Sequence, residues 1–210
     1  MSTPLPPTFR DDGYETQSCS VLHSRYLTVY ERTVMHPESR ESFSYDVVGH
    51  PRASFHSVHV LVAHLRTASS SSPSFSFVRE YGQGPNTLIW SLPAGGFDER
   101  KHSSLEAAAQ AELSEECELS GGELLRLLPH THPGLLESKW CANRFTPFLC
   151  IDPGAAASPG ARDPEEEGLV VHRLTQAEVE EALYGGDMLP PAVLTWHLGL
   201  AELRRRGVAV

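Results

Sequence analysis

The sequence lacks the features that mark secreted and membrane proteins. Its 210 residues include only four cysteines, none of them in a Cys-x-x-Cys pair, and this usage is typical of a reducing compartment. No apolar run approaches the length of a membrane span. The opening residues, MSTPLPPTFRDD, have no apolar core and carry early acidic residues, which supports neither secretion nor an organelle presequence. We therefore expect a cytoplasmic protein that does not bind a membrane.

Positive charge is also scarce. Lys and Arg number 17 against 27 Asp and Glu, a formal net charge of −10, which argues against a general nucleic-acid binder because such a protein needs a basic face. If the protein handles a phosphorylated substrate, it must supply a metal ion and a few local cations. With 40% hydrophobic residues, the length suits one domain with a sizeable core.

The most informative stretch runs from Leu92 to Leu119, LPAGGFDERKHSSLEAAAQAELSEECEL. A glycine turn and a charged loop precede residues 106–118, which contain no Gly or Pro and are rich in strong helix formers. Ser103 and Glu106 have the spacing of a capping box and predict the start of this helix. Three glutamates at i, i+3 and i+4 share one helix face: Glu112, Glu115 and Glu116.

Two interpretations of this acidic face are open. It is either a solvated surface or one side of a metal site. The glycine turn favours the second, because it follows a predicted strand and returns backbone carbonyls toward the same helix. Carboxylates, a carbonyl and water together suit Mg²⁺ or Mn²⁺, and such an ion usually acts on phosphate.

Residues 111–119, AELSEECEL, resemble the second half of the Nudix hydrolase box, G-x5-E-x7-R-E-U-x-E-E-x-G-U, where U is aliphatic. The match departs at Ala111, where the family has Arg, and at Glu118, where it has Gly. Counting back places Ser103 at the first Glu of the box and Phe97 at its first Gly, with one residue inserted after the glycine pair. The resemblance implies that Glu112 and Glu116 are metal ligands and that Glu115 is a third carboxylate ligand. The carbonyl of Ala94 would complete the set.

Other segments resemble the ADP-ribose and ADP-sugar pyrophosphatase branch of this family. Strands predicted at 26–34 and 42–48 are similar to its N-terminal sheet, which builds a homodimer there; an ordinary edge hairpin is the alternative. Arg79 occupies the place of a segment that can meet a phosphate, or else it pairs with a carboxylate of the box. Pro133 stands where the branch carries a marker proline. These positions and the glycine turn give the residues expected to bind substrate: Arg79, Gly95, Gly96 and Pro133.

The branch also places its general base, a glutamate, in a late loop. Here that loop offers three candidates, and the sequence does not choose between them or exclude a solvated acidic turn: Glu165, Glu166 and Glu167. The resemblance further implies that Glu115 takes part in catalysis.

The order of predicted elements gives the expected fold. We expect an α/β protein, a Nudix α/β/α sandwich with a mixed central sheet and an N-terminal β-hairpin extension. Residues 1–20 would be a loose arm, 21–50 the hairpin and dimerisation element, and 51–210 the Nudix domain. Within it we predict core strands at 58–65, 75–81, 143–151 and 169–173, a helix at 175–183 with a capping box, and a closing helix at 190–206.

The function implied is Mg²⁺- or Mn²⁺-dependent hydrolysis of the diphosphate in a nucleoside diphosphate sugar, giving a nucleoside monophosphate and a sugar phosphate. The partner would be this small molecule, with no nucleic acid or membrane, and the protein would form a homodimer. Two alternatives remain. One is a weakened Nudix domain that binds a nucleotide or a protein, which the departures from the box motivate. The other is a Nudix enzyme for another diphosphate, such as a coenzyme A ester or a dinucleotide.

Overall fold

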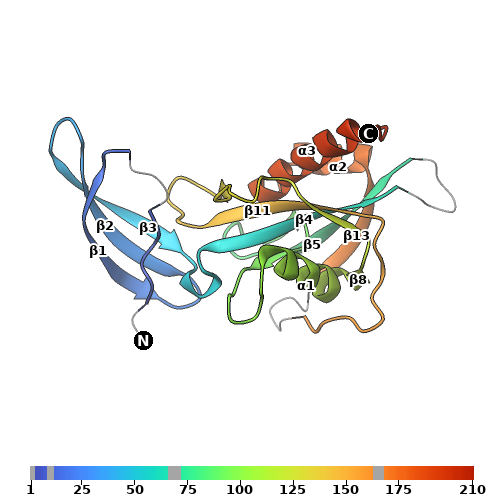
Figure 1. The fold of residues 1–210 in the computed structure, drawn as a ribbon, viewed down its shortest axis with the longest axis horizontal. Helices are drawn as coiled ribbons and strands as arrows, with labels where there is room; N and C mark the ends of the chain where they lie inside the picture. The colour runs from blue at the N-terminus through green and yellow to red at the C-terminus, as the bar shows by residue number, and fades with distance from the viewer. Residues whose placement is uncertain (1–2, 9–11, 66–71, 163–167) are drawn as a thin grey trace.

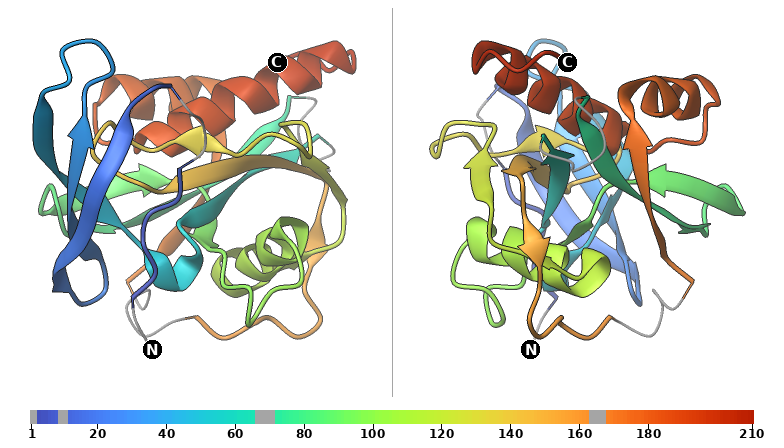
Figure 2. Two further views of the ribbon diagram at one scale, coloured as in Figure 1. Left: turned by 60° about the vertical axis from the view of Figure 1, so that its left-hand side comes forward. Right: turned by 90° about the vertical axis from the view of Figure 1, so that its right-hand side faces the viewer.

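The computed structural model describes residues 3–8, 12–65, 72–162 and 168–210. The expected Glu165, Glu166 and Glu167 lie outside these ranges. Three layers make up the main body: α2 and α3 cover one face of a mixed sheet, and α1 covers the other (Figures 1 and 2). This is the predicted α/β/α sandwich. Within the described ranges, no helix has the length and hydropathy needed to cross a membrane.

Most strands precede the helices in the chain: α1 follows β7, and α2 and α3 come one after the other at the C-terminal end. A three-stranded sheet comes first, with β1 (Glu15–Ser24), β2 (Thr28–Met35) and β3 (Ser42–Gly49), followed by the 3-10 helix η1 (Pro51–Ala53). The main sheet contains β4 (His56–His64), β5 (Ser74–Gly82), β6 (Thr87–Ser91), β7 (Ala94–Gly96), β9 (Glu123–Arg126), β10 (Leu135–Leu136), β11 (Arg144–Ile151) and β13 (Val170–Thr175). A small sheet pairs β8 (Leu119–Ser120) with β12 (Gly154–Ala155), and the helices are α1 (Leu105–Cys117), α2 (Gln176–Tyr184) and α3 (Pro190–Arg205).

Strand β4 lies at the centre of the main sheet and is buried on both faces. It pairs in parallel with β11 and antiparallel with β5 and β7. Because side chains alternate along a strand, Val58, Val60 and Val62 pack under α1, while Leu61 and Ala63 join the core beneath α3. On the α3 side the core contains Trp196, which is 1% exposed. Its ring packs edge-on against that of Phe75, with 4.6 Å between the ring centroids. The apolar strand predicted at 58–65 is therefore the core strand of the fold.

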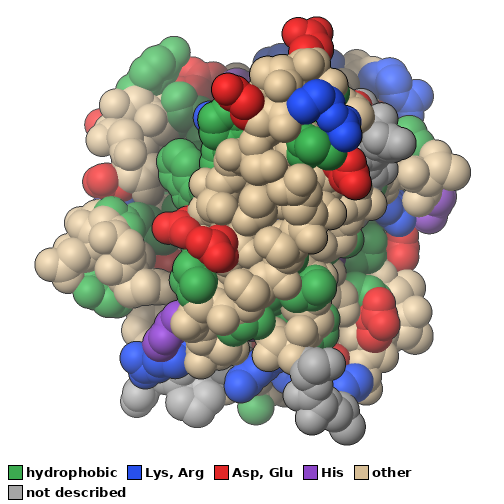
Figure 3. Space-filling view, turned by 90° about the vertical axis from the view of Figure 1, so that its left-hand side faces the viewer, with side chains coloured by type: hydrophobic (Ala, Val, Ile, Leu, Met, Phe, Trp, Pro, Cys, Tyr) green, Lys and Arg blue, Asp and Glu red, His purple; other side chains and the backbone are tan. Residues whose placement is uncertain are grey.

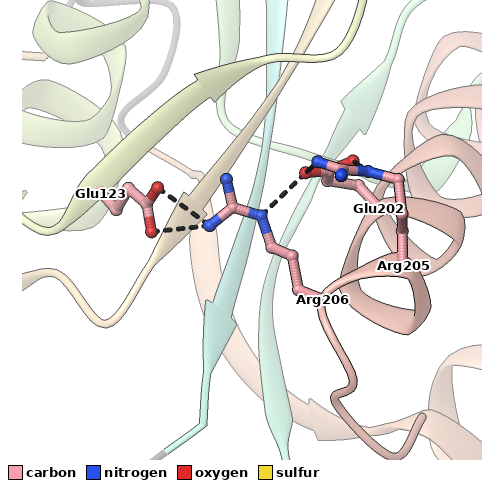
Figure 4. A network of polar contacts seen from close by, with 4 residues as sticks. All are labelled: Glu123, Glu202, Arg205 and Arg206. Atoms are coloured by element: carbon pink, nitrogen blue, oxygen red, sulfur yellow. Dashed lines mark hydrogen bonds and ion pairs between the residues drawn. The ribbon is translucent and has the colours of Figure 1, made fainter.

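The capping box predicted for the second helix is confirmed. Thr175 receives a hydrogen bond from the backbone N–H of Glu178, and the Glu178 carboxylate accepts from the backbone N–H of Thr175 at 2.7 Å. The far end of α3 is tied to strand β9 by Arg206, which donates to both carboxylate oxygens of Glu123 at 2.9 Å and to Glu202 at 2.7 Å (Figure 4).

The N-terminal region differs from the prediction. It is a three-stranded antiparallel sheet rather than a hairpin, and β1 takes in residues 15–20 of the expected loose arm. Residues 3–8 lie across this sheet, since the Pro4 carbonyl accepts a hydrogen bond from the Tyr30 hydroxyl at 2.7 Å and the Pro6 carbonyl accepts from Arg32 at 3.1 Å. The segment 15–24 has no alternation of apolar and polar residues because nearly all of its side chains are exposed, so its sequence carries little strand signal.

Candidate active site at the glutamate helix

Helix α1 begins one residue later than the capping box predicts. Ser104, not Ser103, is the N-cap, and its hydroxyl accepts a hydrogen bond from the Ala107 N–H at 3.1 Å. Glu106 does not reach back to the cap, because its carboxylate lies 3.7 Å from Arg126 and 3.8 Å from His130. The reciprocal half of the predicted capping box is therefore not formed at α1.

The helix buries two of the three predicted carboxylates against the sheet. Glu112 is 8% exposed and Glu116 is 4% exposed, while Glu115 is half-buried. Burial of like charges on one helix face carries a high electrostatic cost unless cations or hydrogen-bond donors compensate for it. Such a cost is expected where acidic side chains have a chemical task, and it disfavours the interpretation of this face as a solvated surface.

The glycine turn forms β7, and the pairing of β7 with β4 points the backbone groups of Ala94 toward α1. Val60 donates to the Pro93 carbonyl at 2.9 Å, and Phe97 donates to the His56 carbonyl at 2.8 Å. In an antiparallel ladder the hydrogen-bonded pairs alternate, so Ala94 is left with both its N–H and its carbonyl pointing away from β4. The Ala94 N–H donates to Glu116 Oε2 at 3.2 Å. The backbone of Ala94 therefore faces the carboxylates of α1.

Gly95 allows this close approach. A Cβ at this position would overlap the Glu112 carboxylate and stand 2.7 Å from its Oε2. Gly96 is similarly confined, since its Cβ would lie 2.7 Å from the Cβ of Ala53. Only glycine lets strand β7 and the glutamate face of α1 come this close together.

A cavity of about 470 Å³ opens in front of this turn. Glu112 and Glu115 of α1 line it together with the three residues of β7. The other lining residues come from the turn between β1 and β2, from η1 and the residue before it, from the loop before α1 and from a late loop: Tyr26, His50, Arg52, Ala53, Asp98, Arg100, Lys101, His102 and Ala161. A second cavity of about 470 Å³ adjoins the first and shares Tyr26, Arg52, Asp98 and Arg100 with it.

The lining of the cavity carries charges of both signs. Glu112 and Glu115 form its acidic wall, and Arg52, Arg100 and Lys101 form its basic wall. The loop that carries Arg100 and Lys101 is shaped by Asp98, whose backbone carbonyl accepts hydrogen bonds from the N–H groups of residues 101 and 102 at 2.9 Å. Side-chain hydrogen bonds from Arg100 at 2.7 and 2.9 Å hold the pKa of Asp98 well below its usual range. A cavity lined by both acidic and basic groups suits a cation together with an anionic ligand.

The carboxylates fit a magnesium ion only as part of a larger ligand set. Among the residues the structure describes, no three His, Cys, Asp or Glu side chains come close enough to enclose a metal. Magnesium is bound in many enzymes by one or two carboxylates and completed by water and substrate phosphate. Glu112 and Glu116 beside the outward-facing backbone of Ala94 meet that requirement, and Gly95 provides the space that their approach needs.

Two residues expected to bind substrate lie away from this cavity. Arg79 shares a face of β5 with Phe77, on the α3 side of the sheet, and its guanidinium lies 4.6 Å from the ring centroid of Trp90. The observed contact of Arg79 is with this indole ring, and its expected contact with a phosphate stays a prediction. Pro133 belongs to the loop before β10 and does not line the cavity within the described residues. The contact between Arg79 and Trp90 could not be predicted from the sequence, because strand register decides which side of a sheet a residue meets.

The basic wall was missing from the sequence prediction. Tyr26, His50 and Arg52 reach the cavity only because the first sheet and η1 fold over the glycine turn, a contact across about 40–70 positions of sequence. Arg100 and Lys101 carried a signal: they sit in the charged loop between the glycine turn and the helix.

Comparison with known proteins supports the fold. Neither a protein-family model nor a curated protein sequence matches the chain. Among solved structures, an ADP compounds hydrolase is 16% identical, with a TM-score of 0.71 over 96% of this chain and 100% of that one. The NUDIX domain of Shewanella oneidensis NrtR, solved in complex with ADP ribose, is 15% identical, with a TM-score of 0.48 over 71% of this chain and 86% of that one. The first match covers nearly the whole chain, and the chain therefore has the predicted Nudix α/β/α fold.

Proposed function

We propose that the protein is a pyrophosphohydrolase that cleaves the diphosphate of a nucleoside diphosphate sugar of the ADP-ribose or ADP-sugar type. The products would be a nucleoside monophosphate and a sugar phosphate. The observation that carries this proposal is the cavity that Glu112 and Glu115 line together with Arg52, Arg100 and Lys101. The likeness to a structure described as an ADP compounds hydrolase supports the choice of substrate class.

Each wall has a task in this mechanism. Glu112 and Glu116, with the Ala94 carbonyl and Glu115 as a third carboxylate, would hold Mg²⁺ or Mn²⁺ beside the glycine turn. When bound, such an ion supplies charge neutralisation on the diphosphate. Arg52 and Lys101 would pair with phosphate oxygens from the basic wall, which fixes the scissile bond between the two walls. The backbone at Gly95 and Gly96 lies next to that position and leaves room for the phosphates.

The attacking water needs a carboxylate base. Glu115 is one candidate, because it is half-buried and lines the cavity. The other candidates are Glu165, Glu166 and Glu167, outside the described ranges. The residues that flank them are described, and Arg162 donates to the Leu169 carbonyl at 2.9 Å, which brings the two flanks together. We leave the choice among these four glutamates to substitution experiments.

We also propose that the first sheet forms a homodimer interface. Small sheets of this size need a packed face to be stable, and β1 exposes nearly all of its side chains. Exposed hydrophobic residues occur on β1, on β3 and on segments next to the strands: Tyr14, Val21, Leu22, Tyr26, Leu27, Phe43 and Tyr45. In Figure 3, which looks onto this end of the molecule, hydrophobic side chains form separate patches divided by acidic and polar groups. That mixed composition is typical of many interfaces, and light scattering would give the oligomeric state directly.

The cytoplasm stays our proposed location. All four cysteines are free in the structure, in keeping with a reducing compartment.

The test is the release of phosphate-containing products from ADP-ribose, ADP-glucose and UDP-glucose with Mg²⁺ or Mn²⁺. Turnover should require the metal and should fall by at least about 100-fold in Glu112→Gln, because the metal and the position of the substrate are lost together. Glu118→Gln is the matched control: it lies on the same helix end, is exposed and does not line the cavity. If none of the three substrates is hydrolysed but the folded protein still binds nucleotide, the protein would be a binding module instead. Normal turnover in Glu112→Gln would refute the site.

A further inference from the structure

The C-terminal end of α1 carries negative charge that no basic residue of its last turn offsets. The last carbonyls of a helix lack partners within the helix, and the helix dipole places negative charge there. Two of the three site glutamates, Glu115 and Glu116, fall in this last turn, which contains no Lys or Arg. Carboxylates are unfavourable at this end of a helix. A cation from elsewhere in the chain would relieve both effects.

Arg162 is that cation. Its guanidinium donates to the carbonyl of Glu116 at 2.7 Å, to the carbonyl of Glu115 at 3.4 Å and to the carbonyl of Leu169 at 2.9 Å. Two of these three carbonyls belong to the glutamates of the last turn of α1. The third lies beyond the late loop, directly before β13.

The contacts fix the main chain from which the carboxylates project. A helical side chain leaves Cα in a direction set by the backbone, so carbonyls held in place also hold the directions of the Glu115 and Glu116 side chains. The second of these carboxylates then meets the Ala94 N–H. The loop before Arg162 packs on the same turn, because the Gly160 N–H donates to the Ser114 hydroxyl at 3.0 Å and a Cβ on Gly160 would lie 3.2 Å from Glu115 Oε1.

We propose that Arg162 is a positioning residue for the glutamates of α1: its planar fork binds the main chain of the helix end and so holds Glu115 and Glu116 in their metal-binding arrangement. This inference rests on the proposed function. It adds a residue distant in sequence, which touches neither the metal nor the substrate. A lysine cannot replace it fully, because a single ammonium group does not reproduce the fork that spans the carbonyls of two segments.

The test compares Mn²⁺ binding to the whole protein, followed by electron paramagnetic resonance, in the wild type, Arg162→Ala and Arg162→Lys. We expect the dissociation constant to rise by about 10-fold or more in Arg162→Ala, the range known for residues that orient metal ligands, and by a smaller factor in Arg162→Lys. Arg204→Ala is the matched control, since Arg204 also donates to a backbone carbonyl, that of Val210 at 3.0 Å, but on α3. Thermal unfolding of each variant shows whether it is folded.

The outcomes separate the two proposals. Wild-type Mn²⁺ affinity in a folded Arg162→Ala would overturn the role of Arg162 and leave the proposed function standing. A wild-type protein that binds no Mn²⁺ and hydrolyses no substrate would overturn the proposed function, and this inference with it. If Arg162→Ala does not fold, Arg162→Lys decides: weakened Mn²⁺ binding at a normal unfolding temperature supports the positioning role, and unchanged binding refutes it.

Discussion

Replacing Gly95 by alanine would test the closest approach in the site with the smallest possible change. One methyl group enters the space occupied by the Glu112 carboxylate and stands 2.7 Å from Oε2. The backbone of Gly95 is not in the left-handed region, so alanine is tolerated by the main chain itself. The strand ladder to Val58 can therefore persist, and the carboxylate is the group that must move.

The size of the effect follows from this overlap. Excess volume in a packed site costs about 1–3 kcal/mol, because side chains are forced away from their preferred rotamers. For a chain of this length that corresponds to a fall in Tm of roughly 2–12 °C. The loss of activity should be far larger than the loss of stability. A carboxylate displaced by about 1 Å from its working position costs on the order of 100-fold in rate.

The assay measures kcat/KM on an ADP-ribose-type substrate and Tm by calorimetry, with Gly84→Ala alongside. Gly84 is a suitable control because a Cβ added there meets no atom within 4 Å. We expect Gly84→Ala to match the wild type in both measurements. If Gly95→Ala keeps wild-type activity, then Glu112 has moved without consequence, and the assignment of Glu112 to the metal site is wrong. If instead Gly95→Ala is unfolded at room temperature, the added methyl group has disrupted strand β7 rather than displaced the Glu112 carboxylate.

Three further outcomes are expected. Glu118→Gly should stabilise the protein by about 1 kcal/mol in urea unfolding, because Glu118 caps α1 at φ 56°, a left-handed conformation that favours glycine; a loss of stability would contradict this. Thr175→Ala should cost about 1 kcal/mol by removing the capping box of α2, and an unchanged urea midpoint would show that the box contributes nothing. Burial lowers the pKa of His59 to about 4, and burial with the nearby Arg173 lowers the pKa of His64 to about 4. Unfolding therefore takes up a proton at each, and stability should fall by about 1.4 kcal/mol per pH unit per histidine from pH 6.5 toward 4; His59→Leu should reduce this slope by one proton.

The sequence predicted those parts of the fold that rest on local pattern. Strand β4 was predicted because residues 58–63 are apolar except for His59, and α2 because Thr175 and Glu178 have the spacing of a capping box. The start of α1 was predicted to within one residue, since Ser104 rather than Ser103 is the N-cap. These features need only short-range information, since periodicity and capping act over one or two turns.

The parts that could not be predicted depend on contacts between distant segments. Strand β1 is held by pairing with β2 and carries no apolar face of its own. The N-cap is Ser104, and Glu106 lies beside Arg126 and His130, which come from segments later in the chain that local capping rules do not take into account. For the same reason the sequence showed the three glutamates but not the basic wall of the same cavity, since Arg52 comes from a different part of the fold.

One contact at the other end of the sheet settles where a proton resides. In the interior, His64 Nε2 lies 2.8 Å from the Ser76 hydroxyl, a pairing that on its own resembles a nucleophile with its base. The other ring nitrogen, Nδ1, lies 2.8 Å from Arg173 Nη2, and a guanidinium can only donate. Nδ1 is therefore an acceptor, and the single proton of the neutral ring sits on Nε2, pointing at the serine oxygen. A ring in that tautomer cannot take a proton from Ser76, so fluorophosphonate reagents, which label activated serines, should leave this residue unmodified.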